Sequence, residues 1–339
     1  MNICLLGQFP PHIGGVASHS QMLARKLAGR GDNVYVLTYP HTDIRDQDEI
    51  TIKTAFTINI KGLRGFIFFL SSLFQLLNIV RKYDIEVIHA HFLIPPGLVA
   101  VLVGGITHRK VVVTVHGSDI FILTRNTLLK ILIKYVLKKA DIIAVVNEDI
   151  RDQILKLDIS GVPDKIRLTP NAVDLEKFKP TNKSALFKEI GIHQKPVVLF
   201  VGNLVDQKGL NYLLDAKKEM ETPSALVIVG DGPLMKKLQE QVKRDGINDV
   251  YFTGARRDVE QIMPGADLFV LPSLSEGSPI SILEAFASGL PAVATNLGGV
   301  KELITPDVGL IVPSKDHTSL KEAMDKILKD KELKKKMAQ

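Results

Sequence analysis

The chain of 339 residues is long enough for two ordinary domains, and its 45% hydrophobic and 24% charged content excludes an intrinsically disordered polymer. A net charge of +6 suits phosphorylated small molecules or an anionic membrane face, but it is too small to indicate nucleic-acid binding by itself. The only cysteine, Cys4, lies in an apolar run, which excludes a disulfide framework and predicts a reduced, buried thiol in a cytoplasmic protein. No basic leader precedes this run, so no signal peptide is expected.

Short apolar runs alternate with helical patterns along the chain. In the first half we expect strands at 2–7, 33–38, 87–91, 110–116, 141–146 and 165–169, with helices at 16–29, 66–82, 96–104, 128–139 and 148–157. The pattern then starts again, with strands at 197–203, 225–230, 250–254, 267–271 and 291–295 and helices at 209–220, 233–244, 279–287 and 318–329. Such alternation predicts parallel sheets built from right-handed βαβ units.

The predicted fold class is therefore α/β, with two Rossmann-like domains whose parallel sheets face a central cleft. We assign residues 1–180 to the first domain and 181–339 to the second. The polar stretch 174–195, which includes Asn182 and Lys183, is the expected link between them.

The segment 65–80 is the nearest approach to a membrane span. It is shorter than the ~20 apolar residues that a spanning helix needs. Its polar members are Ser71, Ser72, Gln75 and Asn78, and its basic flanks are Lys61, Arg64, Arg81 and Lys82. Two interpretations stay open: a helix packed in the core, or an amphipathic element on the inner membrane surface. The stripe of Lys130, Lys134 and Lys138 leaves a similar choice between a solvated face and a lipid-linked acceptor.

Gly14 and Gly15 lie between the first predicted strand and the first predicted helix. Glycines there permit a phosphate to approach the helix N-terminus closely. The pattern is neither the dinucleotide fingerprint nor a Walker loop, and a plain tight turn explains the pair equally well.

His116 ends the strand expected at 110–116. Ligands of open α/β sheets bind beyond the carboxyl ends of the strands, so we expect His116 to reach the ligand rather than only to pack. His89 and His91 also end a strand, and for them a structural role is favoured.

Polar residues also follow strand ends in the second half. Lys208 is placed to act as a point-charge partner of a diphosphate, with a solvated helix-start lysine as the alternative. Arg256 would lie near a nucleotide base, unless its segment is an ordinary turn.

The stretch from Glu276 to Glu284 places two carboxylates eight positions apart around a helix start. Pro279 suits the first helical position, with Ser278 as N-cap. Carboxylates accept hydrogen bonds from hydroxyl groups, and a helix N-terminus tolerates an anion. A sugar attached to a diphosphate needs this combination, although two isolated glutamates would more simply be solvated charges.

The order of these motifs resembles the retaining glycosyltransferases of the GT-B fold, in the large family 4 that uses nucleotide-diphospho sugars. The resemblance covers essentially the whole chain. It rests on Gly14-Gly15, Val115-His116-Gly117, Pro170-Asn171-Ala172-Val173-Asp174, Gly202-Asn203 with Lys208-Gly209, Gly230-Asp231-Gly232-Pro233, Glu276-Gly277-Ser278-Pro279 with Glu284, and Asn296 to Glu302.

The resemblance implies a role for each matching residue. Glu284 would accept hydrogen bonds from the ribose hydroxyls of the donor, and Glu276 would contact the transferred hexose. Lys208 would balance the diphosphate leaving group, and His116 would touch the donor sugar near the reacting centre. The remaining donor-binding residues would be Gly14, Gly15, Asn203, Arg256, Gly277, Ser278, Pro279 and Ile280.

Two departures from the family pattern stand out. Asn203 replaces a frequent arginine, so Lys208 would carry more of the phosphate charge. The family usually has a longer C-terminal helix that returns to the first domain, whereas this chain ends at Gln339, which leaves domain closure open.

The sequence thus predicts a metal-independent retaining hexosyltransferase that needs no cofactor and acts on a hydroxyl-bearing acceptor, with glycans, lipid-linked compounds and small molecules as candidates. Lys208 and helix dipoles would stabilise the leaving group, and no side chain is identified as a covalent nucleophile. The Asp46-Gln47-Asp48 segment is interpreted as solvated surface rather than a metal site. The alternatives are a nucleotide-sugar epimerase or hydrolase on the same fold, and a non-catalytic nucleotide-sugar binding module.

Overall fold

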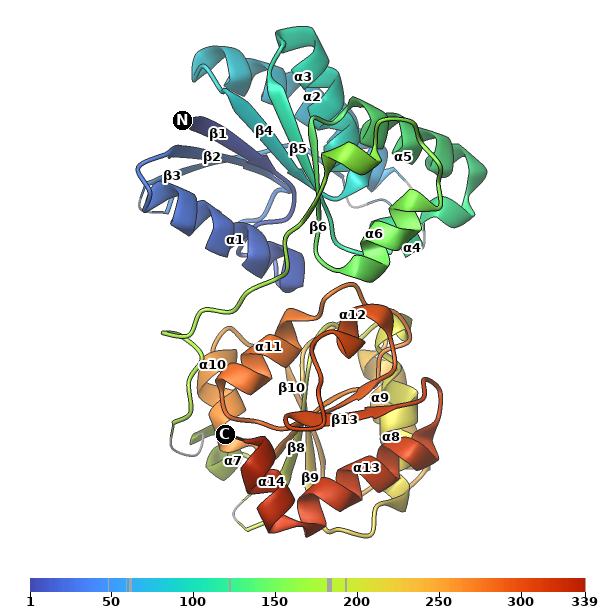
Figure 1. Ribbon diagram of the computed structural model, residues 1–339. Helices are drawn as coiled ribbons and strands as arrows, with labels where there is room; N and C mark the ends of the chain where they lie inside the picture. The colour runs from blue at the N-terminus through green and yellow to red at the C-terminus, as the bar shows by residue number, and fades with distance from the viewer. Residues whose placement is uncertain are drawn as a thin grey trace. The chain divides into compact units, whose positions relative to one another are not determined.

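The computed structural model describes residues 1–47, 49–58, 60, 63–121, 123–181, 185–192 and 194–338. It divides into two compact units, Met1–Asn171 and Ala172–Gln339 (Figure 1). The predicted division lay after residue 180. Asp48, Lys61, Asn182 and Lys183, which entered the predictions above, lie outside the described residues.

The described residues of the N-terminal unit form a seven-stranded, all-parallel sheet in the order β3-β2-β1-β4-β5-β6-β7. Its strands are β1 Asn2–Leu6, β2 Asn33–Thr38, β3 Ile50–Thr54, β4 Val87–His91, β5 Lys110–Val115, β6 Ile142–Val145 and β7 Ile166–Leu168. Its longer helices are α1 Gly15–Ala28, α2 Arg64–Lys82, α3 Leu98–Thr107, α5 Thr127–Lys139 and α6 Glu148–Leu155, and α4 spans Ser118–Phe121.

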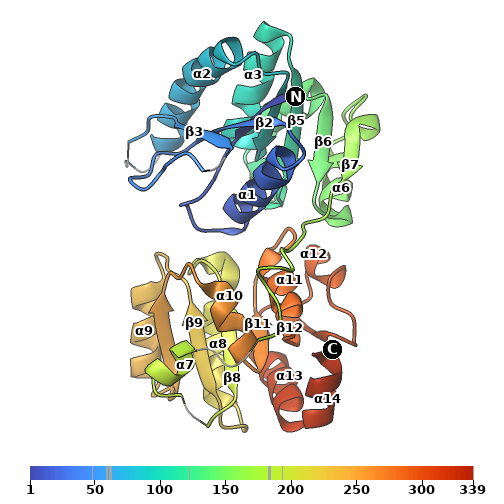
Figure 2. The ribbon, with the colours of Figure 1, turned by 90° about the vertical axis from the view of Figure 1, so that its left-hand side faces the viewer.

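Helices cover the sheet on both faces. The connection through α1 runs from β1 to β2, whereas those through α2, α3 and α5 run in the opposite direction along the sheet. Because parallel crossovers are right-handed, α1 lies on one face and α2, α3 and α5 on the other. Within this second layer α3 packs between α2 and α5, and Figure 2 shows α2 and α3 side by side.

The C-terminal unit has a second all-parallel sheet, with six strands among the described residues in the order β10-β9-β8-β11-β12-β13. The strands are β8 Val197–Val201, β9 Ala225–Val229, β10 Val250–Gly254, β11 Leu268–Leu271, β12 Ala292–Thr295 and β13 Gly309–Val312. The helices are α7 Ala185–Glu189, α8 Leu210–Glu219, α9 Met235–Arg244, α10 Val259–Ile262, α11 Ile280–Ala287, α12 Gly298–Lys301, α13 His317–Lys329 and α14 Lys331–Met337.

Burial explains why these segments become strands. All five residues of β9 are buried, as expected for a central parallel strand covered by helices on both faces. Side-chain caps fix helix starts elsewhere: Asn147 accepts from the backbone of Ile150 at α6, and Asp316 accepts from that of Ser319 at α13. The two-domain, parallel-sheet α/β prediction is confirmed.

Two strands were not predicted, β3 and β13. In β3 the buried residues Ile50 and Ile52 alternate with polar ones, and the strand lies at the sheet edge inside a polar segment. The predicted solvent exposure of Asp46 is confirmed, although its Oδ1 also accepts from the backbone N–H of Ile52 at 2.7 Å. Cys4 is fully buried as predicted, and burial raises the pKa of its thiol to about 12.

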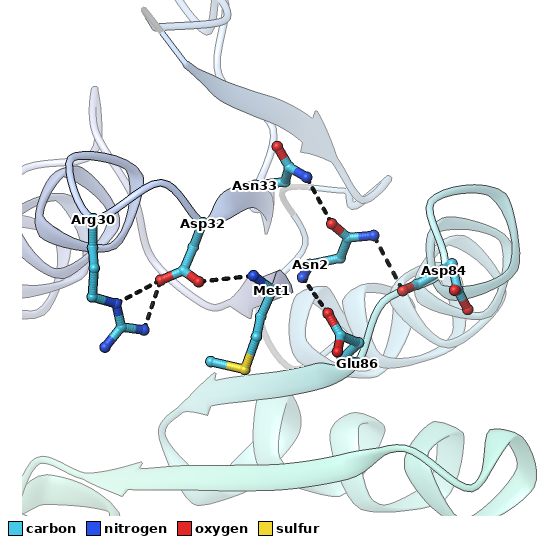
Figure 3. A network of polar contacts seen from close by, with 7 residues as sticks. All are labelled: Met1, Asn2, Arg30, Asp32, Asn33, Asp84 and Glu86. Atoms are coloured by element: carbon cyan, nitrogen blue, oxygen red, sulfur yellow. Dashed lines mark hydrogen bonds and ion pairs between the residues drawn. The ribbon is translucent and has the colours of Figure 1, made fainter.

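A polar network joins the amino ends of β1, β2 and β4 (Figure 3). The terminal amine of Met1 donates to Asp32, and the backbone N–H of Asn2 donates to Glu86 at 2.8 Å. The side chain of Asn33 donates to that of Asn2, also at 2.8 Å. This network occupies the end of the sheet opposite to the carboxyl ends of the strands, where ligands of such sheets bind.

Candidate functional site

The strand order of the C-terminal sheet reverses between the neighbouring strands β8 and β11. The chain leaves β8 toward α8 and leaves β11 toward α11, and right-handed crossovers place these helices on opposite faces of the sheet. Such a switch point opens a crevice beyond the carboxyl ends of the strands. Residues 202–209 and 272–279, which carry most of the predicted site, lie at this point.

Lys208 and Glu276 meet at the switch point. The Nζ atom of Lys208 lies 2.5 Å from Oε1 of Glu276, and Ser273 Oγ donates to the same oxygen at 2.5 Å. Ser273 is fully buried, and its carbonyl oxygen accepts from Oγ1 of Thr295 at 2.6 Å, which ties the loop to β12. The side chains of Lys208 and Glu276 are only 21% and 11% exposed. A ligand with an anionic group and hydroxyl groups can replace this internal ion pair.

Glycines allow the loops of the site to touch through their backbones. Gly209 follows Lys208 with φ of +61°, and a Cβ atom there would overlap the carbonyl oxygen of Pro272. In the same way a side chain at Gly230 would overlap the carbonyl oxygen of Gly202. Only glycine fits such contacts, so the loops after β8, β9 and β11 form one continuous rim.

Glu284 lies in α11, whose first residue is Ile280. Its side chain is half-buried, and burial raises the pKa of its carboxyl group from 4.5 to about 7. The nearby carboxylate of Glu260 acts in the same direction, whereas Lys177, which pairs with Glu260 at 3.4 Å, opposes it. No hydrogen bond to the Glu284 side chain joins it to another described residue. A half-buried carboxylate of this kind is available to hydroxyl groups of a ligand.

The predicted start of α11 is wrong by one residue. Pro279, expected as the first helical residue, is the N-cap, with ψ of 110°, and the helix begins at Ile280. Ser278 is therefore not the N-cap. The φ of −72° at Pro279 fits a cap as well as a first turn, so proline alone could not fix the boundary. Gly277, Pro279 and Ile280 are buried, and the predicted contact of this backbone with sugar and phosphate stays a prediction.

Asn203 follows β8, and Arg256 follows the edge strand β10. Asn203 is exposed beyond the end of β8. Arg256 forms a bidentate pair with Asp258, at 2.9 and 2.6 Å, so its guanidinium group already has an anionic partner. The predicted contact of Arg256 with a base would have to use the face of the guanidinium plane that this pair leaves accessible.

Histidines gather at the switch point of the N-terminal sheet, between β1 and β4. His19 comes from α1, His91 ends β4 and His116 follows β5. His91 Nδ1 lies 3.2 Å from His116 Nε2, and the ring of His19 packs edge-on against both. Burial holds the pKa of His116 well below its usual value, so its ring is neutral at neutral pH.

Among the described residues, this histidine trio is the group whose atoms have metal-ligand spacing, with one nitrogen of each ring within 4.8 Å of the others. Neutral imidazoles can ligate a transition metal such as Zn²⁺, or they can pass a hydrogen bond to His116. The sequence predicted no metal site, since Asp46 and Asp48 were interpreted as solvated surface, and His19 was not predicted as a site residue. Its position one turn into the helix after Gly14-Gly15 was the available signal.

Gly14 and Gly15 lie where they were predicted, at the start of α1. Gly14 is the N-cap with φ of 147°, a region that favours glycine, and Gly15 is the first helical residue. His116, Gly14 and Gly15 all belong to the N-terminal unit, and their predicted contacts with a donor stay predictions.

Known proteins match both units. The family model Glycosyltransferase Family 4 matches residues 13–177, and the model Glycosyl transferases group 1 matches residues 182–339. An Escherichia coli relative, UDP-Gal:alpha-D-GlcNAc-diphosphoundecaprenol alpha-1,3-galactosyltransferase, is 34% identical over 283 residues, 78% of this chain and 72% of the relative. The chain belongs to the family 4, or group 1, glycosyltransferases. This confirms the family resemblance.

Similarity extends over the full length of this glycosyltransferase. An uncharacterised glycosyltransferase of Methanocaldococcus jannaschii is 26% identical over all of this chain and 92% of its own length. Among solved structures, sucrose-phosphate synthase of Thermosynechococcus elongatus superposes with a TM-score of 0.85 at 20% identity, covering 100% and 92% of the two chains. HepE of Anabaena in complex with UDP-glucose gives 0.83 at 19% identity, covering 99% and 92%. These structural matches support the GT-B fold.

Proposed function

We propose that this glycosyltransferase moves a hexose from a nucleotide-diphospho sugar to a hydroxyl group of an acceptor, with retention of the anomeric configuration. The observation that carries the proposal is the shielded Lys208–Glu276 pair at the switch point of the C-terminal sheet. It offers one cation and one hydroxyl-accepting anion side by side. The Escherichia coli relative is named as a UDP-Gal-dependent galactosyltransferase, and HepE of Anabaena has been solved with UDP and with UDP-glucose.

Donor binding would exchange partners at this pair. The ammonium group of Lys208 would turn to the diphosphate, and the carboxylate of Glu276 would accept hydrogen bonds from hexose hydroxyls. Both side chains are mostly buried, so their charges act in a medium less polar than water and interact strongly with the donor. The half-buried carboxylate of Glu284 would accept from the ribose hydroxyls.

The proposed reaction breaks the bond between the anomeric carbon and the phosphate oxygen. The acceptor oxygen forms the new bond on the same face of the sugar, and its proton passes to the departing phosphate. Lys208 stabilises the charge that develops on the nucleoside diphosphate. Since Lys208 supplies this charge, we propose that turnover needs no metal ion.

The test begins with a panel of UDP-, GDP-, ADP- and dTDP-sugars, ranked by the increase in melting temperature that each produces. With the best donor and an alcohol acceptor, release of nucleoside diphosphate is then measured for the wild type and for Lys208→Met and Glu284→Ala. We expect both variants to lose turnover while remaining folded. Lys195→Met, which removes an ion pair with Asp249 outside the site, is the matched control and should keep wild-type rates. Near-wild-type rates for Lys208→Met or Glu284→Ala would refute the assigned roles.

The same assay separates the alternatives. An epimerase or hydrolase would convert the donor without any acceptor. A binding module would be stabilised by the donor and release no nucleoside diphosphate. The configuration of the new linkage, read by NMR, tests retention directly.

A further inference from the structure

The solvent-facing side of α2 is apolar over its first three turns. Phe66, Leu70 and Phe74 lie one turn apart and are 58%, 40% and 70% exposed. The loop before the helix adds exposed Phe56, Ile60 and Leu63. Exposed apolar residues scattered singly are normal, but a contiguous set of large ones marks an interaction surface.

The opposite side of α2 belongs to the hydrophobic core. Phe68, Ser72, Leu76, Ile79 and Val80 are buried, and the helix packs on α3. By length and hydropathy α2 is the one helix of the described residues that could cross a membrane, and only 28% of its apolar 18-residue stretch is buried in the fold. A spanning orientation would pull the buried side out of the core. The helix is therefore suited to lie along an apolar boundary rather than to cross it.

The outer face of α5 has a similar character. Leu128, Ile131 and Tyr135 are exposed at helical spacing, and Lys130 and Lys138 are exposed beside them. Because α2 and α5 both pack on α3 in one layer, their outer faces look away from the same side of the sheet. Of the sixteen large hydrophobic residues found exposed in the described parts of the chain, ten belong to this layer and its loop.

The charges of this layer have one sign. Residues 50–83 contain five Lys or Arg and no Asp or Glu, and residues 120–140 again contain five and none. The whole chain has a net charge of only +6, so the rest of it is net acidic. Lys130, Lys134, Lys138 and Lys139 form no ion pair with any residue that the structure describes.

We propose that the outer faces of α2 and α5 bind the surface of an anionic lipid bilayer. The apolar side chains would enter the interface, and the cations of both helices would meet the lipid phosphates. A second copy of the chain fits poorly, because its corresponding face would carry the same unpaired positive charge. The proposal does not depend on the proposed transfer reaction, because binding to lipid is measured without turnover.

The absence of tryptophan from the chain permits a direct probe. Phe74→Trp places a single indole on the surface, and Leu175→Trp places one at a similarly exposed site, 67%, in the C-terminal unit. Vesicles of phosphatidylcholine with phosphatidylglycerol should shift the emission of the Phe74→Trp variant to the blue, and brominated lipid should quench it. The Leu175→Trp emission should not change. No shift for Phe74→Trp, or an equal shift for both variants, would overturn the proposal.

Co-sedimentation with the same vesicles tests both components of the interaction. Phe66→Gln combined with Phe74→Gln should reduce the bound fraction at least about tenfold, whereas Leu175→Gln should leave it unchanged. Arg81→Gln with Lys82→Gln should weaken binding and reduce its sensitivity to salt. An unchanged bound fraction in the Phe66→Gln, Phe74→Gln variant would contradict the proposed membrane-binding surface. So would a dimer in solution that disappears in the Phe66→Gln, Phe74→Gln variant, because it would identify a second copy as the occupant.

Discussion

Glu284→Gln should stabilise the protein at about pH 8 while abolishing donor binding. In the folded state the pKa of Glu284 is raised from 4.5 to about 7, mainly by burial. The contribution of a group with a raised pKa is fully present below its unfolded value and is lost as the pH rises through the folded value. The wild type therefore carries a cost at about pH 8 that a neutral glutamine does not.

The size of this cost follows from the shift. A difference of about 2.5 pKa units corresponds to about 3 kcal/mol, as an upper figure for a half-buried side chain. For a unit of the size of Ala172–Gln339, this is equivalent to a rise in melting temperature of about 6–12 °C. At about pH 4.5, where the wild-type carboxyl group is largely protonated, the two proteins should melt nearly together.

Scanning calorimetry of the full chain at both pH values is the assay. The transition of the C-terminal unit should move in Glu284→Gln at the higher pH and hardly at the lower. Equal or lower stability of the variant at about pH 8 would show that the ionised carboxylate does not destabilise the fold. The claim that burial of Glu284 costs stability in the absence of a ligand would then be wrong.

Three further predictions concern the same site and the histidines. Gly209→Ala should destabilise the protein by at least about 2 kcal/mol, because its Cβ would overlap Pro272, whereas Gly246→Ala has a similar φ and open space and should cost less; denaturant midpoints compare them, and equal losses would contradict the close backbone contact. His89, whose pKa burial lowers to about 4, should contribute stability that is lost as the pH falls from about 6.5 to 4, up to about 3 kcal/mol. Acid titrations of the unfolding midpoint should show a smaller slope in this window for His89→Asn, and an unchanged slope would refute it. Turnover should survive EDTA; a loss restored by Zn²⁺ would instead assign the trio around His116 to a metal.

The sequence predicted much of the fold because buried parallel strands leave an unambiguous trace. The runs of β2, β4 and β10 were placed to the residue because each begins directly after a charged residue, although β10 lies at the sheet edge and is only partly buried. The edge strand β3 was not predicted, because only Ile50 and Ile52 of its five residues are apolar and buried. The edge strand β13 was not predicted either, although all four of its residues are apolar.

The sequence predicted both members of the Lys208–Glu276 ion pair but not the contact between them. Lys208 and Glu276 were each selected, but they lie 68 residues apart, and nothing local shows that their side chains touch. Their contact follows from the strand order, which makes β8 and β11 neighbours at the switch point. His19 was missed for the same reason. Its ring contacts with His91 and His116 form only when α1, β4 and β5 pack together.

For Arg256 the sequence predicted a ligand contact and missed a partner within the chain. A cation after β10 suggested a ligand contact, but Asp258 lies two residues further along the chain and binds the same guanidinium group. The spacing was visible in the sequence, whereas the turn that brings the two side chains together was not.

A crystal structure of the protein with its preferred nucleotide sugar tests the central claim most directly. We expect the ribose hydroxyls within hydrogen-bonding distance of the Glu284 carboxylate, the diphosphate against Lys208, and the Lys208–Glu276 pair opened. A nucleotide bound away from the loops after β8 and β11, with that pair intact, would contradict the proposed site.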